Sequence, residues 1–130
     1  MFSIEDFAQL QFLVGRWQGE GADGKPFYEE YDHPAPHLFQ SHRYSSAAFN
    51  ERTDGSSIAF EDGQVTSQWG DFTWRASSIG ADNAAFEPVH APSHFAWRRV
   101  DATTLEARQR WMAEGREQQH TIRLTRIDAT

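Results

Sequence analysis

Cysteine is absent from the 130 residues, and Lys25 is the one lysine. Without cysteine, disulfide bonds, thiolate metal sites and cysteine nucleophiles are all excluded. No stretch approaches the roughly 18 apolar residues that a membrane-spanning helix needs. The first residues show neither the basic region nor the apolar run of a secretion signal. We therefore expect a cytoplasmic protein with no membrane insertion.

Positive charge is also scarce, since the formal net charge is −7 and the isoelectric point lies near 5.2. A nucleic-acid-binding domain needs a basic surface to meet the phosphate backbone. We therefore expect no nucleic-acid partner.

Aromatic residues, in contrast, are plentiful at 14% of the chain, with ten Phe, five Trp and three Tyr. Large rings bury much area and often line apolar ligand pockets, although they also fill small cores. Composition alone leaves both interpretations open.

Residues 1–14 are predicted to form a short helix and its lead-in, within a single domain that spans residues 1–130. Ser3 and Asp6 have the spacing of a capping box, and Phe7, Leu10 and Leu13 share one helical face. Ten short segments with strand character follow, separated by turn residues such as Asp-Gly pairs. The predicted strands are 16–21, 26–33, 37–46, 56–61, 64–69, 72–79, 84–89, 94–100, 104–112 and 116–127. Short connections favour pairing between sequence neighbours, and closure removes exposed edges. We therefore predict an all-β, up-and-down antiparallel β-barrel of about ten strands with a short N-terminal helix.

The segment Phe12-Leu13-Val14-Gly15-Arg16-Trp17-Gln18-Gly19-Glu20-Gly21 resembles the calycin superfamily, in which a short helix leads through Gly-x-Trp into the first barrel strand. Its extended form looks most like the nitrobindin-like and fatty-acid-binding-protein-like branch. The segment 86–99 and the closing residues 105–108 and 122–126 are similar to bacterial lipocalin-like domains. The resemblance implies a barrel around a ligand cavity, with Trp17 as a structural plug beneath the helix.

Alternation of side chains along each strand predicts which residues face the interior. In the third strand we choose Leu38, Gln40, His42 and Tyr44, because the opposite face would bury Arg43. Trp74 shares an inward face with Phe72, Ala76 and Ser78, and Trp97 shares one with Phe95. The last two strands contribute Leu105, Ala107, Gln109 and Trp111, and then His120, Ile122 and Leu124. The candidate ligand-binding residues are Gln40, His42, Tyr44, Trp74, Trp97, Gln109, Trp111 and His120. For residues 28–33 the inward face stays open, because a buried Glu29 would need a partner such as Arg.

An apolar interior with a few convergent polar groups is typical of a small-molecule site. We therefore predict a carrier or sensor of a small, largely apolar molecule, with no cofactor, no metal site and no catalytic residue assigned, and with a homodimer left open. One alternative, which the nitrobindin-like resemblance implies, is a haem protein with His120 as the axial ligand. Another is a small acid–base enzyme, an isomerase or lyase, using His42 with Tyr44 or His120 with Gln40.

Overall fold

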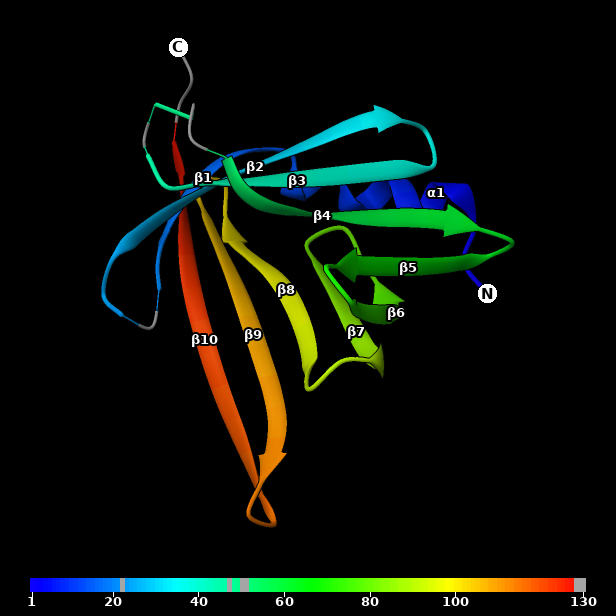
Figure 1. Ribbon diagram of the computed structural model, residues 1–130. Coiled ribbons are helices and arrows are strands. Elements are labelled where there is room, and N and C mark those ends of the chain that lie inside the picture. The colour runs from blue at the N-terminus through cyan, green and yellow to red at the C-terminus, as the bar shows by residue number, and fades with distance from the viewer. Residues whose placement is uncertain (22, 47, 50–51, 128–130) are drawn as a thin grey trace.

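The computed structural model confirms the closed antiparallel barrel (Figure 1). It describes residues 1–21, 23–46, 48–49 and 52–127. Ten strands follow one another around the barrel and β1 pairs with β10, so no edge is left open. The strands are β1 (Gly15–Glu20), β2 (Pro26–Ala35), β3 (Leu38–Tyr44), β4 (Arg52–Glu61), β5 (Gln64–Trp69), β6 (Phe72–Ile79), β7 (Asn83–His90), β8 (His94–Asp101), β9 (Thr104–Ala113) and β10 (Arg116–Ile127). None of the helices in the described part of the chain has the length and apolar character to cross a membrane.

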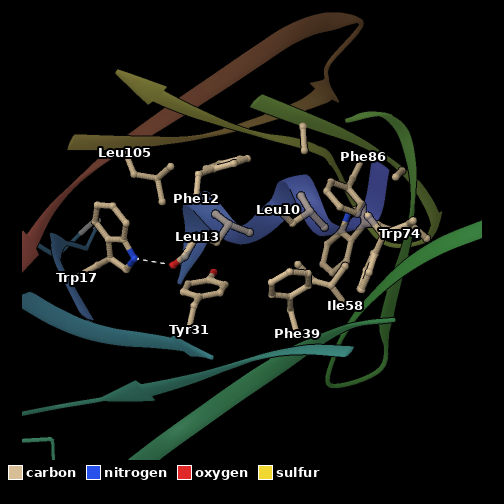
Figure 2. Close-up of a cluster of buried hydrophobic side chains, with 14 of the residues drawn as sticks. Leu10, Phe12, Leu13, Trp17, Tyr31, Phe39, Ile58, Trp74, Phe86 and Leu105 are labelled. Atoms are coloured by element: carbon tan, nitrogen blue, oxygen red, sulfur yellow. Dashed lines mark hydrogen bonds between the residues drawn. The ribbon is translucent and has the colours of Figure 1, made fainter. Parts of the chain in front are cut away.

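The N-terminal helix α1 (Ile4–Ala8) begins at the predicted capping box and continues as the 3₁₀-helix η1 (Gln9–Leu13). The Ser3 hydroxyl accepts a hydrogen bond from the Asp6 amide at 3.1 Å, and the Asp6 carboxylate accepts one from the Ser3 amide at 2.9 Å. These bonds satisfy amides that the first helical turn leaves free. Phe7, Leu10 and Leu13 are fully buried. Figure 2 shows Leu10 and Leu13 directed among the rings of the core.

Trp17 joins this helix to the first and last strands. Its side chain is fully buried, and its indole N–H donates to the Leu13 carbonyl at 2.9 Å (Figure 2). The Arg126 guanidinium lies 4.4 Å from the centre of the indole ring, and Arg126 Nη1 donates to the Val14 carbonyl at 3.0 Å. Gly19 lies inward on the same strand, where a Cβ would collide with the side chains of Leu124 and Phe27. The tryptophan and this glycine of the opening motif therefore serve packing at the closure of the barrel.

All predicted strand limits but one lie within two residues of the observed ones, and the limits of two strands have a structural explanation. We expected the break after the second strand at Pro34, whereas β2 continues to Ala35 with a pairing irregularity between Asp32 and Ala35. We expected the fourth strand to begin at Ser56, whereas β4 begins at Arg52 because its first residues pair with the end of β3. A proline at an irregularity costs no ladder hydrogen bond, which explains why Pro34 is tolerated.

In β6 the predicted inward face holds for only part of the strand. Trp74 and Ala76 are buried as expected. The pairing with β7 then slips between Ala76 and Ser78, which leaves Ser78 exposed and makes Ile79 pack against the core. The expectation that Ser78 faces inward is therefore wrong, because one extra residue at a bulge reverses the alternation that follows it.

Candidate functional site

A cavity of about 310 Å³ lies inside the barrel, toward the end where β1 turns into β2 and β5 turns into β6. It is lined by Phe27, Glu29, Tyr31, Ser41, Arg43, Asp54, Gly55, Ser56, Ile58, Ser67, Trp69, Trp74, Phe95, Trp97, Ala107, Arg108, Gln109, Ile122 and Leu124. The cavity opens to solvent at this end, because four residues of its lining are exposed: Asp54, Trp69, Arg108 and Gln109. The strands on one side contribute most of the polar side chains, and the strands opposite contribute mostly rings and aliphatic groups.

The polar side of the cavity is built by a row of charged residues across three neighbouring strands. Pairing places Glu29 of β2 opposite Arg43 of β3, and Arg43 opposite Asp54 of β4. Arg43 Nη2 donates to Glu29 Oε1 at 2.6 Å, and Arg43 Nε lies 3.9 Å from Asp54 Oδ1. The Glu29 side chain is only 8% exposed, whereas that of Arg43 is 38% exposed. Arg43 therefore compensates a buried carboxylate while its own charge reaches the cavity.

Burial alone would lower the pKa of Arg43, but the adjacent charge of Glu29 and its hydrogen bond raise it overall, with a further contribution from Asp54. The guanidinium also lies over the Phe27 ring, with Cζ 4.5 Å from its centre. The single cation of this wall is therefore held on two sides by carboxylates and on one face by an aromatic ring.

The next row inward carries hydroxyl groups. Tyr31, Ser41 and Ser56 are cross-strand neighbours, and the two serine hydroxyls lie 2.6 Å apart. Burial raises the pKa of the Tyr31 phenol well above its ordinary value of 10.0, and the charge of Glu29 and a hydrogen bond with it raise the pKa further. Tyr31 is therefore a neutral hydrogen-bonding group at physiological pH.

The raised pKa of Tyr31 predicts a loss of stability in alkali. Below pH 10 the phenol is protonated in both the folded and the unfolded chain. Above pH 10 it ionises in the unfolded chain first, so the free energy of unfolding falls as pH rises, by roughly 1.4 kcal/mol per pH unit for one group. A Tyr31→Phe variant should lose this part of the alkaline dependence in urea unfolding between pH 9 and 11. Tyr28→Phe, on the opposite face of β2, is the matched control, and an equal effect of both variants would contradict the prediction.

The opposite side of the cavity is apolar and rich in rings. Trp74 packs edge-on against Phe95, with ring centres 5.1 Å apart, and Phe95 packs edge-on against Trp97 at 6.1 Å. Trp74 is fixed further by its indole N–H, which donates to the Ser93 carbonyl at 2.7 Å. Ala107 pairs with Trp97 and with Ile122, and Ala107 and Ile122 add small and aliphatic surface beside the rings.

The predicted inward face of β3 is wrong. Phe39 and Ser41 are buried and Arg43 lines the cavity, while Gln40, His42 and Tyr44 do not belong to its lining. The prediction assumed that Arg43 could not face inward, but Glu29 on the adjacent strand supplies the compensating charge.

The side chains on the other face of β3 have partners of their own. His42 Nε2 lies 3.6 Å from Asp32 Oδ2, and the Tyr44 ring packs edge-on against Phe49 with ring centres 5.2 Å apart. The proposed acid–base pair of His42 and Tyr44 therefore does not face the cavity.

Three of the predicted residues, Trp74, Trp97 and Gln109, do line the cavity. Trp111 and His120 lie outside its lining, although the alternation predicted for their strands is correct. His120 is paired with Gln109, and Trp111 lies two residues beyond Gln109 on the same face of β9. Both residues belong to the β9–β10 hairpin, which projects past the rest of the barrel (Figure 1).

Sequence reasoning missed the Glu29–Arg43–Asp54 row. The usable signal was the alternation of Glu29 and Tyr31 on one face of the second strand, together with an Arg on the third strand at a matching distance from the turn. The pairing of β2 with β3 brings these two residues opposite each other.

The lining does not fit a haem held through His120. The described residues of the lining include no histidine, cysteine or methionine, and the raised pKa of Tyr31 disfavours the phenolate that would bind iron. No group of three or more His, Cys, Asp or Glu that could hold a metal ion occurs within residues 1–21, 23–46, 48–49 and 52–127.

Comparisons with known proteins add little beyond the architecture. No protein-family model matches the sequence, and no curated protein matches it. Among solved structures, a redesigned β-barrel is 12% identical, with a TM-score of 0.43, and the alignment covers 92% of this chain and 96% of that one. The structure of EF1p2_mFAP2b bound to DFHBI is 14% identical, with a TM-score of 0.44, and the alignment covers 92% and 97% of the two chains. These likenesses concern barrel shape and indicate nothing about a ligand of this chain, and no comparison assigns it to the calycins.

Proposed function

We propose that this protein is a carrier or sensor that binds a small, largely apolar molecule inside the barrel, as calycin-like barrels do. The observation that carries the proposal is the two-sided cavity, with rings of β6 and β8 facing the charged and hydroxyl groups of β2, β3 and β4. Its volume of about 310 Å³ is at the lower end of the range for ligand sites, which begins near 300 Å³.

The shape of the cavity supports a ligand with an apolar body and one polar end. Trp74, Phe95 and Trp97 offer perpendicular ring surfaces that suit a flat or compact hydrocarbon group. The hydroxyls of Ser41 and Ser56 and the Arg43 guanidinium lie across from them and supply both donors and acceptors. Such a division fixes the orientation of a bound molecule as well as its affinity.

Filling the cavity should abolish binding without unfolding the protein. Ala107 lies in the cavity wall at the middle of β9, and Ala107→Trp would place a large ring in the open volume. Binding of a neutral solvatochromic dye such as Nile red, followed by its fluorescence, should weaken by at least about tenfold when its site is occupied by a side chain.

Ala113→Trp is the matched control, because Ala113 lies on the same strand and face but at the tip of the β9–β10 hairpin. It should leave dye binding unchanged. Native mass spectrometry of the freshly purified wild type tests for a retained small molecule in parallel. If the dye does not bind the wild type, or if both tryptophan variants bind it equally well, the cavity is not the binding site.

A further inference from the structure

The polar wall of the cavity, formed by β2, β3 and β4, is unbalanced in charge, although the whole lining holds two carboxylates and two guanidinium groups. Two carboxylates, Glu29 and Asp54, face the guanidinium of Arg43, which leaves one negative charge in excess on this wall. Among the described residues, the one other charged member of the lining is Arg108 of β9. Arg108 is exposed, and it lies between Ala107 and Gln109 along the strand. Arg108 therefore lies across the cavity from the polar wall, and water screens its charge as it screens that of the exposed Asp54.

Arg43 is poorly placed to capture an additional anion. A guanidinium recognises a ligand carboxylate best when its forked N–H groups are free to donate to both oxygens. Here Nη2 already donates to Glu29 at 2.6 Å, Nε faces Asp54 at 3.9 Å, and the planar group lies over the Phe27 ring. A carboxylate brought to this wall would approach Glu29 and Asp54 without gaining a free cation there.

The rings of the lining favour the opposite charge. Phe27, Trp69, Trp74, Phe95 and Trp97 all contribute to the cavity. The face of an aromatic ring carries partial negative charge and attracts a cation, most strongly for tryptophan and in sites shielded from water. The excess carboxylate and the ring faces thus act in the same direction.

From this arrangement we infer that the cavity selects an amine cation with an apolar body over a carboxylate of the same size. The inference rests on the proposed function, because it names the charge class of the molecule bound at that same site. The polar end of the ligand lies near Glu29 and Asp54, its apolar body lies against Trp74 and Phe95, and the open mouth leaves the ammonium partly hydrated.

Three probes that share one ring system test the inference: 2-naphthylmethylamine, 2-naphthamide and 2-naphthoate, measured by isothermal titration calorimetry at pH 7 and low salt. The wild type should bind the amine about tenfold or more tightly than the naphthoate, the size expected from a cation–π contact together with one favourable charge. The neutral amide should fall between them.

Glu29→Gln should remove most of the preference for the amine over the naphthoate, because it cancels the excess negative charge of the polar wall. It also removes one of the two carboxylates that hold Arg43, so that only Asp54 remains beside the guanidinium. Glu30→Gln is the matched control: it changes the net charge equally, but Glu30 is the next residue of β2, on the outer face, where its carboxylate accepts from Arg16 at 2.7 Å. The amine-to-naphthoate ratio should stay at its wild-type value in this control.

Each outcome has a separate meaning. Naphthoate binding as tightly as the amine to the wild type would overturn the charge selection while leaving the binding function in place. A preference that Glu29→Gln does not change would overturn the role of the Glu29–Arg43 pair. Failure of all three probes and of the neutral dye would overturn the proposed function itself.

Discussion

An Arg43→Leu variant is expected to lose about 3 kcal/mol of its free energy of unfolding, because it leaves the buried Glu29 carboxylate without its partner. Glu29 is 8% exposed and receives its 2.6 Å hydrogen bond from Arg43. Removing one member of a buried pair costs more than the pair itself contributes, since the remaining charge keeps its desolvation penalty. Urea unfolding at pH 7, followed by tryptophan fluorescence, measures the loss.

A double variant, Glu29→Leu with Arg43→Leu, separates this explanation from a general packing defect. It removes both charges together, and apolar residues in place of a buried ion pair are often neutral for stability or favourable. We expect it to recover most of the stability that Arg43→Leu loses. If the double variant is less stable than the single one, the cost does not come from an unpaired carboxylate.

Arg123→Leu provides the comparison for an ordinary surface pair. Arg123 is 66% exposed and donates to Glu106 at 3.0 Å on the outside of the barrel. Exposed ion pairs contribute about 0–1 kcal/mol because water and salt screen them. A cost for Arg123→Leu equal to that of Arg43→Leu would argue against a special position for the Glu29 pair.

Trp17→Ala is expected to destabilise the barrel by about 4 kcal/mol, the cost typical of removing a fully buried tryptophan. The variant opens a cavity between the helix and the first strand, removes the hydrogen bond to the Leu13 carbonyl and takes away the ring beneath the Arg126 guanidinium. Because β1 and β10 close the barrel at this point, we expect the loss to appear as a lower midpoint of a single cooperative transition in urea.

Trp17→Phe keeps a ring at this position and replaces the alanine variant if that variant does not fold. Its loss of free energy of unfolding should be about half that of Trp17→Ala. Trp69→Ala is the contrasting control, because Trp69 is 37% exposed at the mouth of the cavity. It should cost much less stability than Trp17→Ala. Equal costs for the two alanine variants would show that Trp17 has no special role in closing the barrel.

Much of the architecture could be predicted from the sequence because its determinants are local. Asp62 and Gly63 both take positive φ angles, 54° and 79°, in the two-residue turn between β4 and β5. Such turns favour this residue pair, and they bring the flanking strands into a hairpin. The Ser3–Asp6 capping box is equally local and was recognised from its spacing alone.

The composition of the site could be predicted only in part. Trp74, Trp97 and Gln109 were placed correctly by alternation, which operates within one strand. Alternation alone gave the wrong inward face for β3, with Gln40, His42 and Tyr44. The inward face of this strand depends on Glu29 of β2, which compensates the charge of Arg43. Trp111 and His120 follow the predicted alternation but lie outside the lining, because alternation within a strand does not predict how far along that strand a cavity extends.

Local features of the chain suffice to predict the helix, the strands, their turns and the closed order of the barrel, because capping, alternation and turn conformation act over a few residues. Which carboxylate meets which guanidinium, where the bulge in β6 reverses a face, and how the charges are divided between the walls of the cavity depend on the folded barrel. Those properties arise from register between strands, and the free energy of burying a charge is set by the neighbours that the register supplies.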